Sequence, residues 1–236
     1  MAKKNPAMRG LWRLAILVCT LSGTGGIWML AQSEELVNIS DSHSIEAFNL
    51  SAHWAQGNVV ALVRHAERCD KSQSPCLDGD TGITVRGKDM ALKLGGNFAA
   101  FLPQSHTHFY NSPVKRTEQT ARYMFKGASR SKEWLHESCK LNFLEDILKN
   151  KEEGVNMVLV THSTCINNLH PLIDDNPATL HAGGRESYGI TIFLAISKVD
   201  KKVYVLGDLF PDDWRHLSEG ALRVARKRTS PVSTTL

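Results

Sequence analysis

The first 31 residues of this 236-residue chain contain no Asp or Glu. The beginning of this segment instead holds four cations, Lys3, Lys4, Arg9 and Arg13. An uncharged run from residue 14 to residue 31 follows. A basic flank before an uncharged run is typical of a secretory signal, with a cleavage point after Ala31. The run is also near the length that spans a bilayer, so a retained membrane anchor is the alternative.

Both interpretations of residues 1–31 place the rest of the chain outside the cytoplasm, and we expect the periplasm. That remainder lacks a net charge, because 24 Lys and Arg face 24 Asp and Glu once the four N-terminal cations are set aside. A nucleic-acid partner would require an excess of cations, so charge gives that class no support. Residues 211–236 are basic and rich in Ser and Thr. We interpret them as a solvated tail or, alternatively, as a contact with an anionic membrane surface.

The chain has no Cys-x-x-Cys pair, which argues against a zinc site. Cys19 lies in the apolar segment and leaves four cysteines in the remainder. An even count in an exported protein favours disulfides over four free thiols. Cys69 and Cys76 bracket a short polar loop that is sterically easy to close. Cys139 would then pair with Cys165.

The sequence shows no internal repeat, no low-complexity tract and no second hydrophobic core. We therefore expect one folded domain over residues 58–210. Residues 32–57 would form an N-terminal extension between the export segment and this domain, and residues 211–236 would follow it as the tail.

Strand and helix patterns alternate along the expected domain. Short apolar runs predict strands at 58–63, 108–111, 157–160, 190–195 and 203–206. Segments of helical period predict helices at 84–101, 114–124, 141–149 and 164–172, and Thr84 is a candidate N-cap. This alternation favours an α/β fold, a three-layer sandwich with a mainly parallel central sheet.

Basic and imidazole side chains follow three of the predicted strands. They are Arg64 and His65 after the first, Arg116 after the second and His162 after the third. Ligands of open α/β sheets bind just beyond the carboxyl ends of the strands, so these side chains would line one pocket. A phosphate dianion would relieve the repulsion among them through charge-assisted hydrogen bonds. A neutral histidine can attack phosphorus while the other groups stabilise the charge that develops, so no metal or cofactor is expected.

The order of these motifs resembles that of a known superfamily. Arg64-His65-Ala66 follows the first strand, and a Ser-x-x-x-Arg-x-x-x-Thr-Ala stretch runs from Ser112 to Ala121. Residues 82–87 resemble the start of the family's first helix, and His162 matches its late histidine. Together these motifs resemble the histidine phosphatase superfamily, also called the phosphoglycerate mutase-like family. The resemblance covers residues 58–207 and implies a phosphoglycerate mutase-like fold.

The resemblance also implies roles for individual residues. His65 would be the nucleophile that forms a phosphohistidine, Arg64 and Arg116 would hold the phosphate, and His162 would hold it and stabilise the transition state. Glu137 follows Arg116 at the family's spacing for the acid that protonates the leaving group, and Glu67 is the rival. The candidate substrate-binding residues are Arg68, Glu67, Ser112 and Thr117.

The sequence departs from the family pattern at Ala66 and Ser163, where relatives often have glycine, and neither change removes a catalytic group. We expect an exported phosphomonoesterase. The stretch from Val63 to Asp70, with Cys76 and residues 81–84, is similar to exported family members whose substrate is a phosphorylated sugar of an envelope glycolipid. One alternative is an exported histidine phosphatase for small soluble phosphate esters or phosphohistidine proteins. An alternative of another class is a catalytically silent phosphate-binding sensor module.

Overall fold

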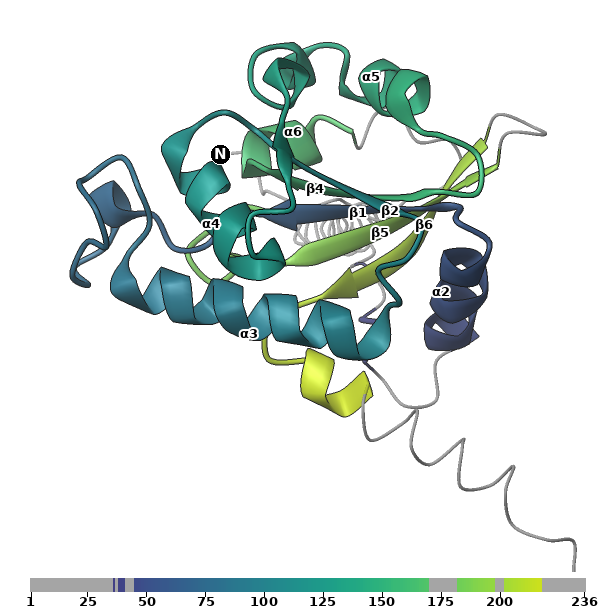
Figure 1. Cartoon of the computed structure of the whole chain (residues 1–236), viewed down its shortest axis with the longest axis horizontal. Coiled ribbons are helices and arrows are strands. Elements are labelled where there is room, and N and C mark those ends of the chain that lie inside the picture. The colour runs from purple at the N-terminus through teal and green to yellow at the C-terminus, as the bar shows by residue number, and fades with distance from the viewer. Residues whose placement is uncertain (1–35, 37, 41–44, 170–181, 198–201, 218–236) are drawn as a thin grey trace, which may run out of the picture. The chain divides into compact units, whose positions relative to one another are not determined.

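The computed structural model describes residues 36, 38–40, 45–169, 182–197 and 202–217 (Figure 1). The chain divides into two compact units, and the described residues all lie in the second, residues 35–236. The predicted export segment and most of the predicted tail lie outside the described residues. Within the described part of the chain, no helix combines the length and the apolar character needed to span a bilayer.

Six strands form one sheet in the order β3-β2-β4-β1-β5-β6 (Figure 1). Their bounds are β1 Val59–Arg64, β2 Thr107–Asn111, β3 Arg130–Ser131, β4 Asn156–Thr161, β5 Thr191–Ser197 and β6 Lys202–Leu209. Strands β1, β4, β2 and β3 are parallel neighbours, whereas β5 pairs antiparallel with both β1 and β6. Only β5 therefore runs against the other described strands, and the expected mainly parallel sheet is confirmed.

Helices cover both faces of the sheet (Figure 1). Their bounds are α2 Ile45–Ala55, α3 Val85–Phe101, α4 Lys115–Phe125, α5 Phe143–Asn150 and α6 Ser163–Asn167. Short 3-10 helices are η1 Cys69–Lys71, η2 Glu133–Leu135 and η3 Ser138–Lys140. Helices α2, α3 and α4 pack on one face, and α5 and α6 pack on the other. The three-layer sandwich is thus confirmed.

The two cores follow from the alternation of side chains along buried strands. On β1, Val59, Ala61 and Val63 pack into the core that contains Phe98 of α3. Val60 and Leu62 of the same strand pack into the opposite core, which contains residues of α5 and α6. Every residue of β1 is buried, as expected for a central strand covered on both faces.

Helix α3 begins where the sequence predicts. Thr84 accepts a hydrogen bond from the backbone N–H of Gly87 (2.9 Å), which is the expected N-cap. Further along α3, a Cβ atom at Gly95 would lie 2.1 Å from the carbonyl oxygen of Met124 in α4. Glycine at this position therefore allows the two helices to pack with their backbones in close approach.

The core extends beyond the expected domain of residues 58–210. Ile39, Leu50 and Trp54 precede that range and are buried in the same core as β1. Trp214 lies in the predicted tail, yet its side chain is fully buried and packs 4.7 Å from the ring of Phe98, centroid to centroid. The folded unit therefore extends further along the chain in both directions than hydrophobic periodicity indicated.

Two elements differ from the sequence expectation. The helix expected over residues 164–172 is described only as α6, followed by a turn at residues 168–169, and the rest of that range lies outside the described residues. The two-residue strand β3 was not expected, because it pairs with β2 over only two residues. So short a strand leaves no recognisable sequence period.

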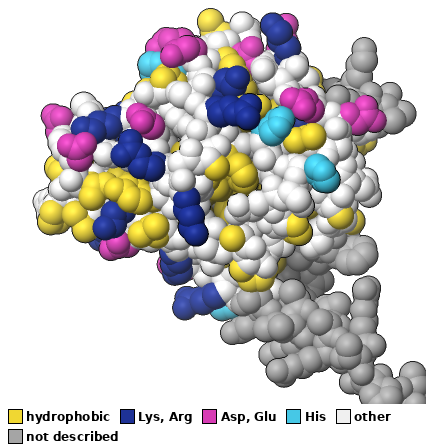
Figure 2. Space-filling model, viewed as in Figure 1, with side chains coloured by type: hydrophobic (Ala, Val, Ile, Leu, Met, Phe, Trp, Pro, Cys, Tyr) yellow, Lys and Arg dark blue, Asp and Glu magenta, His cyan; other side chains and the backbone are white. Residues whose placement is uncertain are grey.

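The surface in Figure 2 carries Lys and Arg side chains interspersed with Asp and Glu. On this face no single extended patch of one sign is visible (Figure 2). This distribution agrees with the balanced charge of the chain beyond its N-terminal segment.

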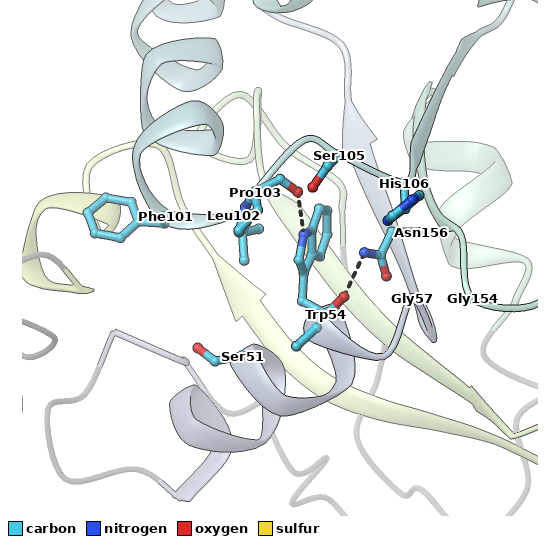
Figure 3. A pocket seen from close by; sticks show the side chains of 11 residues that line it. Ser51, Trp54, Gly57, Phe101, Leu102, Pro103, Ser105, His106, Gly154 and Asn156 are labelled. Atoms are coloured by element: carbon cyan, nitrogen blue, oxygen red, sulfur yellow. Dashed lines mark hydrogen bonds between the residues drawn. The ribbon is translucent and has the colours of Figure 1, made fainter.

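A pocket of about 430 Å³ lies at the amino ends of the central strands (Figure 3). Trp54 and Asn156 line it, together with the loop around Pro103. The indole of Trp54 donates to the Pro103 carbonyl (2.9 Å), and the Asn156 amide donates to the Trp54 carbonyl (2.8 Å). These bonds tie α2 to the loop after α3 and to β4, and the pocket lies at the opposite strand ends from the residues described next.

Candidate active site

The carboxyl ends of three neighbouring parallel strands bring the predicted residues together. Strand β4 lies between β1 and β2, so the ends of all three open on one edge of the sheet. His65 donates its backbone N–H to the Thr161 carbonyl (3.0 Å), and Ser112 donates its own to the Val160 carbonyl (3.0 Å). The three motifs therefore continue the strand pairing before they diverge into loops and helices.

The ring of His65 is buried, with 3% of the residue exposed. Its Nδ1 atom lies 2.8 Å from the carbonyl oxygen of Ala66. A carbonyl oxygen only accepts hydrogen bonds, so Nδ1 carries the proton and Nε2 keeps its lone pair. Arg116 directs its Nε–H at that lone pair from 3.3 Å. Nε2 of His65 is thus unprotonated and faces Arg116.

The second histidine, His162, lies beside the first. The two ring centroids are 5.5 Å apart in an edge-to-face arrangement. Arg116 donates through Nη2 to Nδ1 of His162 (3.3 Å), and the Ser112 hydroxyl lies 3.0 Å from Nε2. Because Nδ1 accepts from a guanidinium, the proton of the neutral ring is on Nε2 and faces Ser112.

Burial and neighbouring cations keep both histidines neutral. Burial lowers the pKa of His65 well below its ordinary value, and the charges of His162, Arg116 and Arg64 act in the same direction. Burial also lowers the pKa of His162 to about 3, with Arg116 as the next cause. Both effects disfavour an added positive charge among fixed cations. At neutral pH the site therefore holds two uncharged imidazoles between charged guanidiniums.

Arg116 connects the two rings from the first turn of α4. Its burial lowers its pKa, although a guanidinium remains charged at any physiological pH. The N-terminus of α4 also directs the positive end of its dipole to this edge of the sheet. The Arg116 guanidinium and the helix dipole therefore both favour an anion here.

Arg64 is 6% exposed, and residues of the loop before β5 hold its side chain. Its Nη1 donates to the carbonyl of Gly184 and to the hydroxyl of Ser187. Its guanidinium also lies over the ring of Tyr188, with Cζ 4.2 Å from the ring centroid. Its Nε has no hydrogen-bond partner among the described residues. The residue thus keeps one buried donor for a ligand.

Arg68 pairs with the nearby carboxylate of Asp70 through its Nε and Nη2 atoms. The Arg68 charge also lowers the pKa of Arg116 after burial, the largest cause, so the pair lies close to the site. Arg68 is one of the predicted substrate-binding residues, and its fork is already engaged by Asp70. A substrate anion would share this guanidinium with Asp70.

The carboxylate of Glu67 is engaged by three other residues, and its expected roles in binding substrate or donating the leaving-group proton stay predictions. Its carboxylate accepts from Arg86 Nε (2.9 Å), from the Thr84 hydroxyl (2.8 Å) and from the Ser72 hydroxyl (2.9 Å). The hydrogen bond from Arg86 is the largest cause that lowers its pKa. A carboxylate held ionised by donors from three residues is a poor acid, so Glu67 anchors the loop between β1 and α3.

Ser112 and Thr117 support the site in different ways. Ser112 contacts His162 directly, as described above. The hydroxyl of Thr117 donates instead to the carbonyls of Ser112 (2.9 Å) and Val114 (2.5 Å). The expectation that Thr117 binds substrate is therefore corrected: it is fully buried and fastens the start of α4, the helix that carries Arg116.

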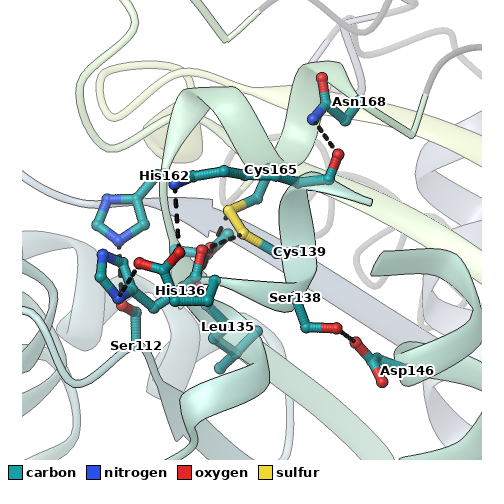
Figure 4. The surroundings of a disulfide bond; sticks show 12 residues. Ser112, Leu135, His136, Ser138, Cys139, Asp146, His162, Cys165 and Asn168 are labelled. Atoms are coloured by element: carbon teal, nitrogen blue, oxygen red, sulfur yellow. Dashed lines mark hydrogen bonds and ion pairs between the residues drawn. A yellow bond between two sulfur atoms is a disulfide. The ribbon is translucent and has the colours of Figure 1, made fainter. Parts of the chain in front are cut away.

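Glu137 follows His136 near the site, and its contacts are with His136 and Lys140. Within the described part of the chain, it forms no hydrogen bond or ion pair with the residues predicted to bind phosphate, which are Arg64, His65, Arg116 and His162. Its side chain is 72% exposed, and its two carboxylate oxygens lie 3.1 Å from Nδ1 of His136 and 3.6 Å from Nζ of Lys140. The ring of His136 in turn lies 6.0 Å from the ring of His162, centroid to centroid (Figure 4). The role of Glu137 as the leaving-group acid stays a prediction, and the structure places His136 between it and His162.

Two disulfides hold loops of this edge, and both expected pairings are confirmed. Cys69 pairs with Cys76 in the loop after β1, with Cα atoms 5.3 Å apart. Cys139 pairs with Cys165, with Cα atoms 5.1 Å apart (Figure 4). The second bond fastens η3 to α6, so the segment that carries His136 is tied to the helix that follows His162.

Sequence reasoning missed Tyr188, Ser187 and His136. Tyr188 and Ser187 come from a loop before β5 and meet Arg64 only in the fold. Each lies in a polar segment without periodicity, so no signal in a single sequence singles them out. His136 had a weak signal, because it directly precedes Glu137.

The chain is similar in sequence to known phosphatases. Residues 60–137 match the sequence model of the histidine phosphatase superfamily (branch 1), which confirms the resemblance over that segment. The chain is also 37% identical over 119 residues to proteins named lipopolysaccharide core heptose(II)-phosphate phosphatase from Salmonella paratyphi B and Salmonella typhimurium. These matches cover 50% of this chain and 58% of each relative, so they span little more than half of those proteins.

Two solved phosphatase structures resemble the chain at low sequence identity. A phosphoserine phosphatase from Entamoeba histolytica is 13% identical, with a TM-score of 0.48 over 66% of this chain and 98% of that one. A putative phosphohistidine phosphatase from Agrobacterium tumefaciens is 17% identical, with a TM-score of 0.48 over 65% of this chain and 97% of that one.

Proposed function

We propose that this chain is a phosphomonoesterase that works through a phosphohistidine intermediate on His65. One observation carries the proposal: Nε2 of His65 is unprotonated, because Nδ1 donates to Ala66, and it faces the guanidinium of Arg116 at 3.3 Å. A nucleophile and a phosphate-binding group therefore converge on one point.

In the first step, Nε2 of His65 forms a bond to phosphorus while the bond from phosphorus to the ester oxygen breaks. The leaving oxygen takes its proton from an acid, for which Glu137 is the predicted residue. In the second step, water attacks the phosphohistidine, the nitrogen–phosphorus bond breaks, and the water proton goes to the acid site that was emptied in the first step. The free enzyme and inorganic phosphate result.

Each cationic group has a place in this scheme. Charge gathers on the equatorial oxygens during phosphoryl transfer, so preorganised donors there lower the barrier. Arg116 and the buried Nε of Arg64 supply such donors, and His162 would supply another when its Nε2–H turns from Ser112 to the phosphate. Arg116 donates to the two histidines, and a bound phosphate would take over those hydrogen bonds.

We further propose that the substrate is a heptose phosphate of the lipopolysaccharide core and that the protein acts in the periplasm. The relatives at 37% identity carry that substrate in their names. The basic, acid-free N-terminus and the two disulfides support an oxidising compartment outside the cytoplasm. Residues 1–31 or the basic tail would supply any contact with the membrane surface.

The enzymatic proposal is tested with p-nitrophenyl phosphate and the purified chain. We expect turnover in the wild type and its loss in His65→Ala, with His53→Ala as the matched control on α2, outside the site. No turnover in the wild type would favour a silent phosphate-binding module. Undiminished turnover in His65→Ala would reject His65 as the nucleophile.

The substrate proposal is tested in cells. We expect the mass of the lipopolysaccharide core to rise by one phosphate when the gene is deleted, and to return when the wild type but not His65→Ala is supplied. An unchanged core mass would reject the heptose assignment. Turnover of small phosphate esters or phosphohistidine proteins by the purified chain would then identify the alternative substrate class.

A further inference from the structure

The loop before β5 packs against the site from a side that none of the three strand-end motifs provides. Arg64 donates its backbone N–H to the carbonyl of Ile190 (3.0 Å) in this loop. The Arg64 guanidinium donates through Nη1 to the Gly184 carbonyl and the Ser187 hydroxyl. The loop therefore holds both the backbone and the side chain of the arginine that precedes His65.

Tyr188 is the residue of this loop that reaches the site itself. It is 5% exposed, and the centroid of its ring lies 4.2 Å from Cζ of Arg64 and 5.7 Å from the ring centroid of His65. A guanidinium over an aromatic face is attracted by the ring quadrupole, and the attraction is strongest where water is excluded. Tyr188 therefore packs against both the nucleophile and its neighbouring arginine.

The electrostatic neighbours of Tyr188 place it among the cations of the site. Burial is the largest cause that lowers the pKa of Arg64 and of Arg116, and Tyr188 opposes that shift at both residues. Hydrogen bonding to Asp70 raises the pKa of Arg68, and Tyr188 acts in the same direction there. These effects agree with a position of Tyr188 near the cations of the site, of which Arg64 is in direct contact with its ring.

The remaining donors of Arg64 show what this arrangement serves. Nη1 is taken by the loop, while Nε is buried and has no partner among the described residues. An unpaired buried donor is costly, and a ligand oxygen would satisfy it. The loop therefore fixes one edge of the guanidinium and leaves Nε, on another edge, without a partner among the described residues.

We infer that Tyr188 is a positioning residue for phosphate recognition: its ring holds the Arg64 guanidinium so that the Nε edge meets a phosphate oxygen beside His65. This inference rests on the proposed phosphomonoesterase function. It specifies which residue orients the Arg64 guanidinium in the site. The interaction runs through the aromatic face, so the ring is needed and the hydroxyl is not.

Three single substitutions distinguish the role of the Tyr188 ring from that of its hydroxyl. We expect Tyr188→Leu to raise KM for p-nitrophenyl phosphate and to weaken binding of inorganic phosphate by roughly tenfold, with a smaller change in kcat. Tyr188→Phe keeps the ring and should remain close to the wild type in both quantities. Tyr204→Leu, at an exposed position on β6, is the matched control. Equal losses in the Phe and Leu variants, or unchanged phosphate binding in Tyr188→Leu, would overturn the inference.

A double-mutant cycle with Arg64→Ala distinguishes positioning from a general structural role. If Tyr188 acts through Arg64, adding Tyr188→Leu to Arg64→Ala should weaken phosphate binding by less than about twofold beyond the single change. A further tenfold loss of phosphate affinity in the double variant would contradict the inference. Should Tyr188→Leu fail to fold, Ser187→Ala removes another holder of Arg64, and its loss of phosphate affinity should also vanish in the Arg64→Ala background.

Binding of inorganic phosphate is measured by calorimetry and needs no turnover. A chain that binds phosphate but hydrolyses no ester would reject the proposed enzymatic function and still test the role of Tyr188. A chain that hydrolyses esters equally well with Tyr188→Leu would reject the role of Tyr188 alone. The two failures are therefore distinguishable.

Discussion

Nδ1 of His65 lies 2.8 Å from the carbonyl oxygen of Ala66, the next residue in the chain. This short-range contact fixes the tautomer of the buried imidazole and leaves Nε2 directed at Arg116. Ala66 is itself held, because its backbone N–H donates to the Thr120 hydroxyl of α4 (3.0 Å). The orientation of the candidate nucleophile is thus set by backbone geometry.

The low pKa values of the two histidines predict how stability changes with pH. An unfolded histidine titrates near about 6.5, whereas the folded pKa of His162 is about 3 and that of His65 is also well below 6.5. The unfolded chain therefore binds more protons, and this contribution is present above about pH 6.5 and is lost as the pH falls toward the folded values. We expect the free energy of unfolding to fall by up to about 1.4 kcal/mol per pH unit for each histidine below pH 6.5.

Urea denaturation between pH 7 and pH 4 measures this slope. His162→Gln should show a shallower decline than the wild type over the same range, while His53→Gln serves as the control on α2. Equal slopes in the wild type and His162→Gln would contradict the assignment of a low pKa to His162.

Arg116 couples the two histidines, so its loss should change both binding and titration. We expect Arg116→Met to raise the pKa of His162 above about 3, since Arg116 is the second cause of its depression after burial. We also expect kcat/KM to fall on the order of 10²-fold, because donors to the developing charge are removed. Ring-proton NMR titration and steady-state kinetics measure the two effects.

Arg122→Met is the matched control for that experiment, because Arg122 is exposed on the same helix and pairs with Glu118. An unchanged His162 titration together with an unchanged kcat/KM in Arg116→Met would exclude Arg116 from the site.

Glu67 should affect stability more than catalysis. Glu67→Gln removes the charge that Arg86, Thr84 and Ser72 all contact. We expect Tm to fall by about 2–6 °C, with KM for p-nitrophenyl phosphate nearly unchanged. A rise in KM at constant Tm would place Glu67 among the substrate-binding residues. The exposed Glu118→Gln provides the comparison for Tm.

The predicted acid is tested by the dependence of rate on the leaving group. If Glu137 protonates the leaving oxygen, Glu137→Gln should slow alkyl phosphates by about 10²–10⁴-fold and leave p-nitrophenyl phosphate, whose leaving group needs no proton, nearly unchanged. The exposed Glu133→Gln is the control on the same loop. Equal effects on both substrates would contradict the role, and the same selective loss in His136→Gln alone would transfer it to His136.

The sequence allowed much of the fold and the centre of the site to be predicted because both depend on local signals. The apolar run of β1 and the Arg-His pair that follows it are contiguous, and the same holds for His162 after β4. Parallel pairing then brings these ends together without further information. The two disulfides could be predicted because cysteines are few.

The surroundings of the site could not be predicted in the same way. Glu67 is part of the first motif, but its contact with Arg86 arises only when the loop folds back over the start of α3. Tyr188 meets Arg64 across the sheet edge, and Trp214 reaches the core from a segment whose composition is that of a tail. Each of these contacts depends on tertiary packing, which leaves no periodic pattern in the chain.

The most direct test of the account is to trap the phosphoryl group on His65. The wild type is mixed with p-nitrophenyl phosphate, quenched within milliseconds in alkali, digested, and analysed by mass spectrometry and ³¹P NMR. The account predicts one acid-labile phosphate on the peptide that contains His65, bonded to Nε2, and none in His65→Ala. Phosphate bound at Nδ1, phosphate on another residue, or turnover without any phosphohistidine would contradict it.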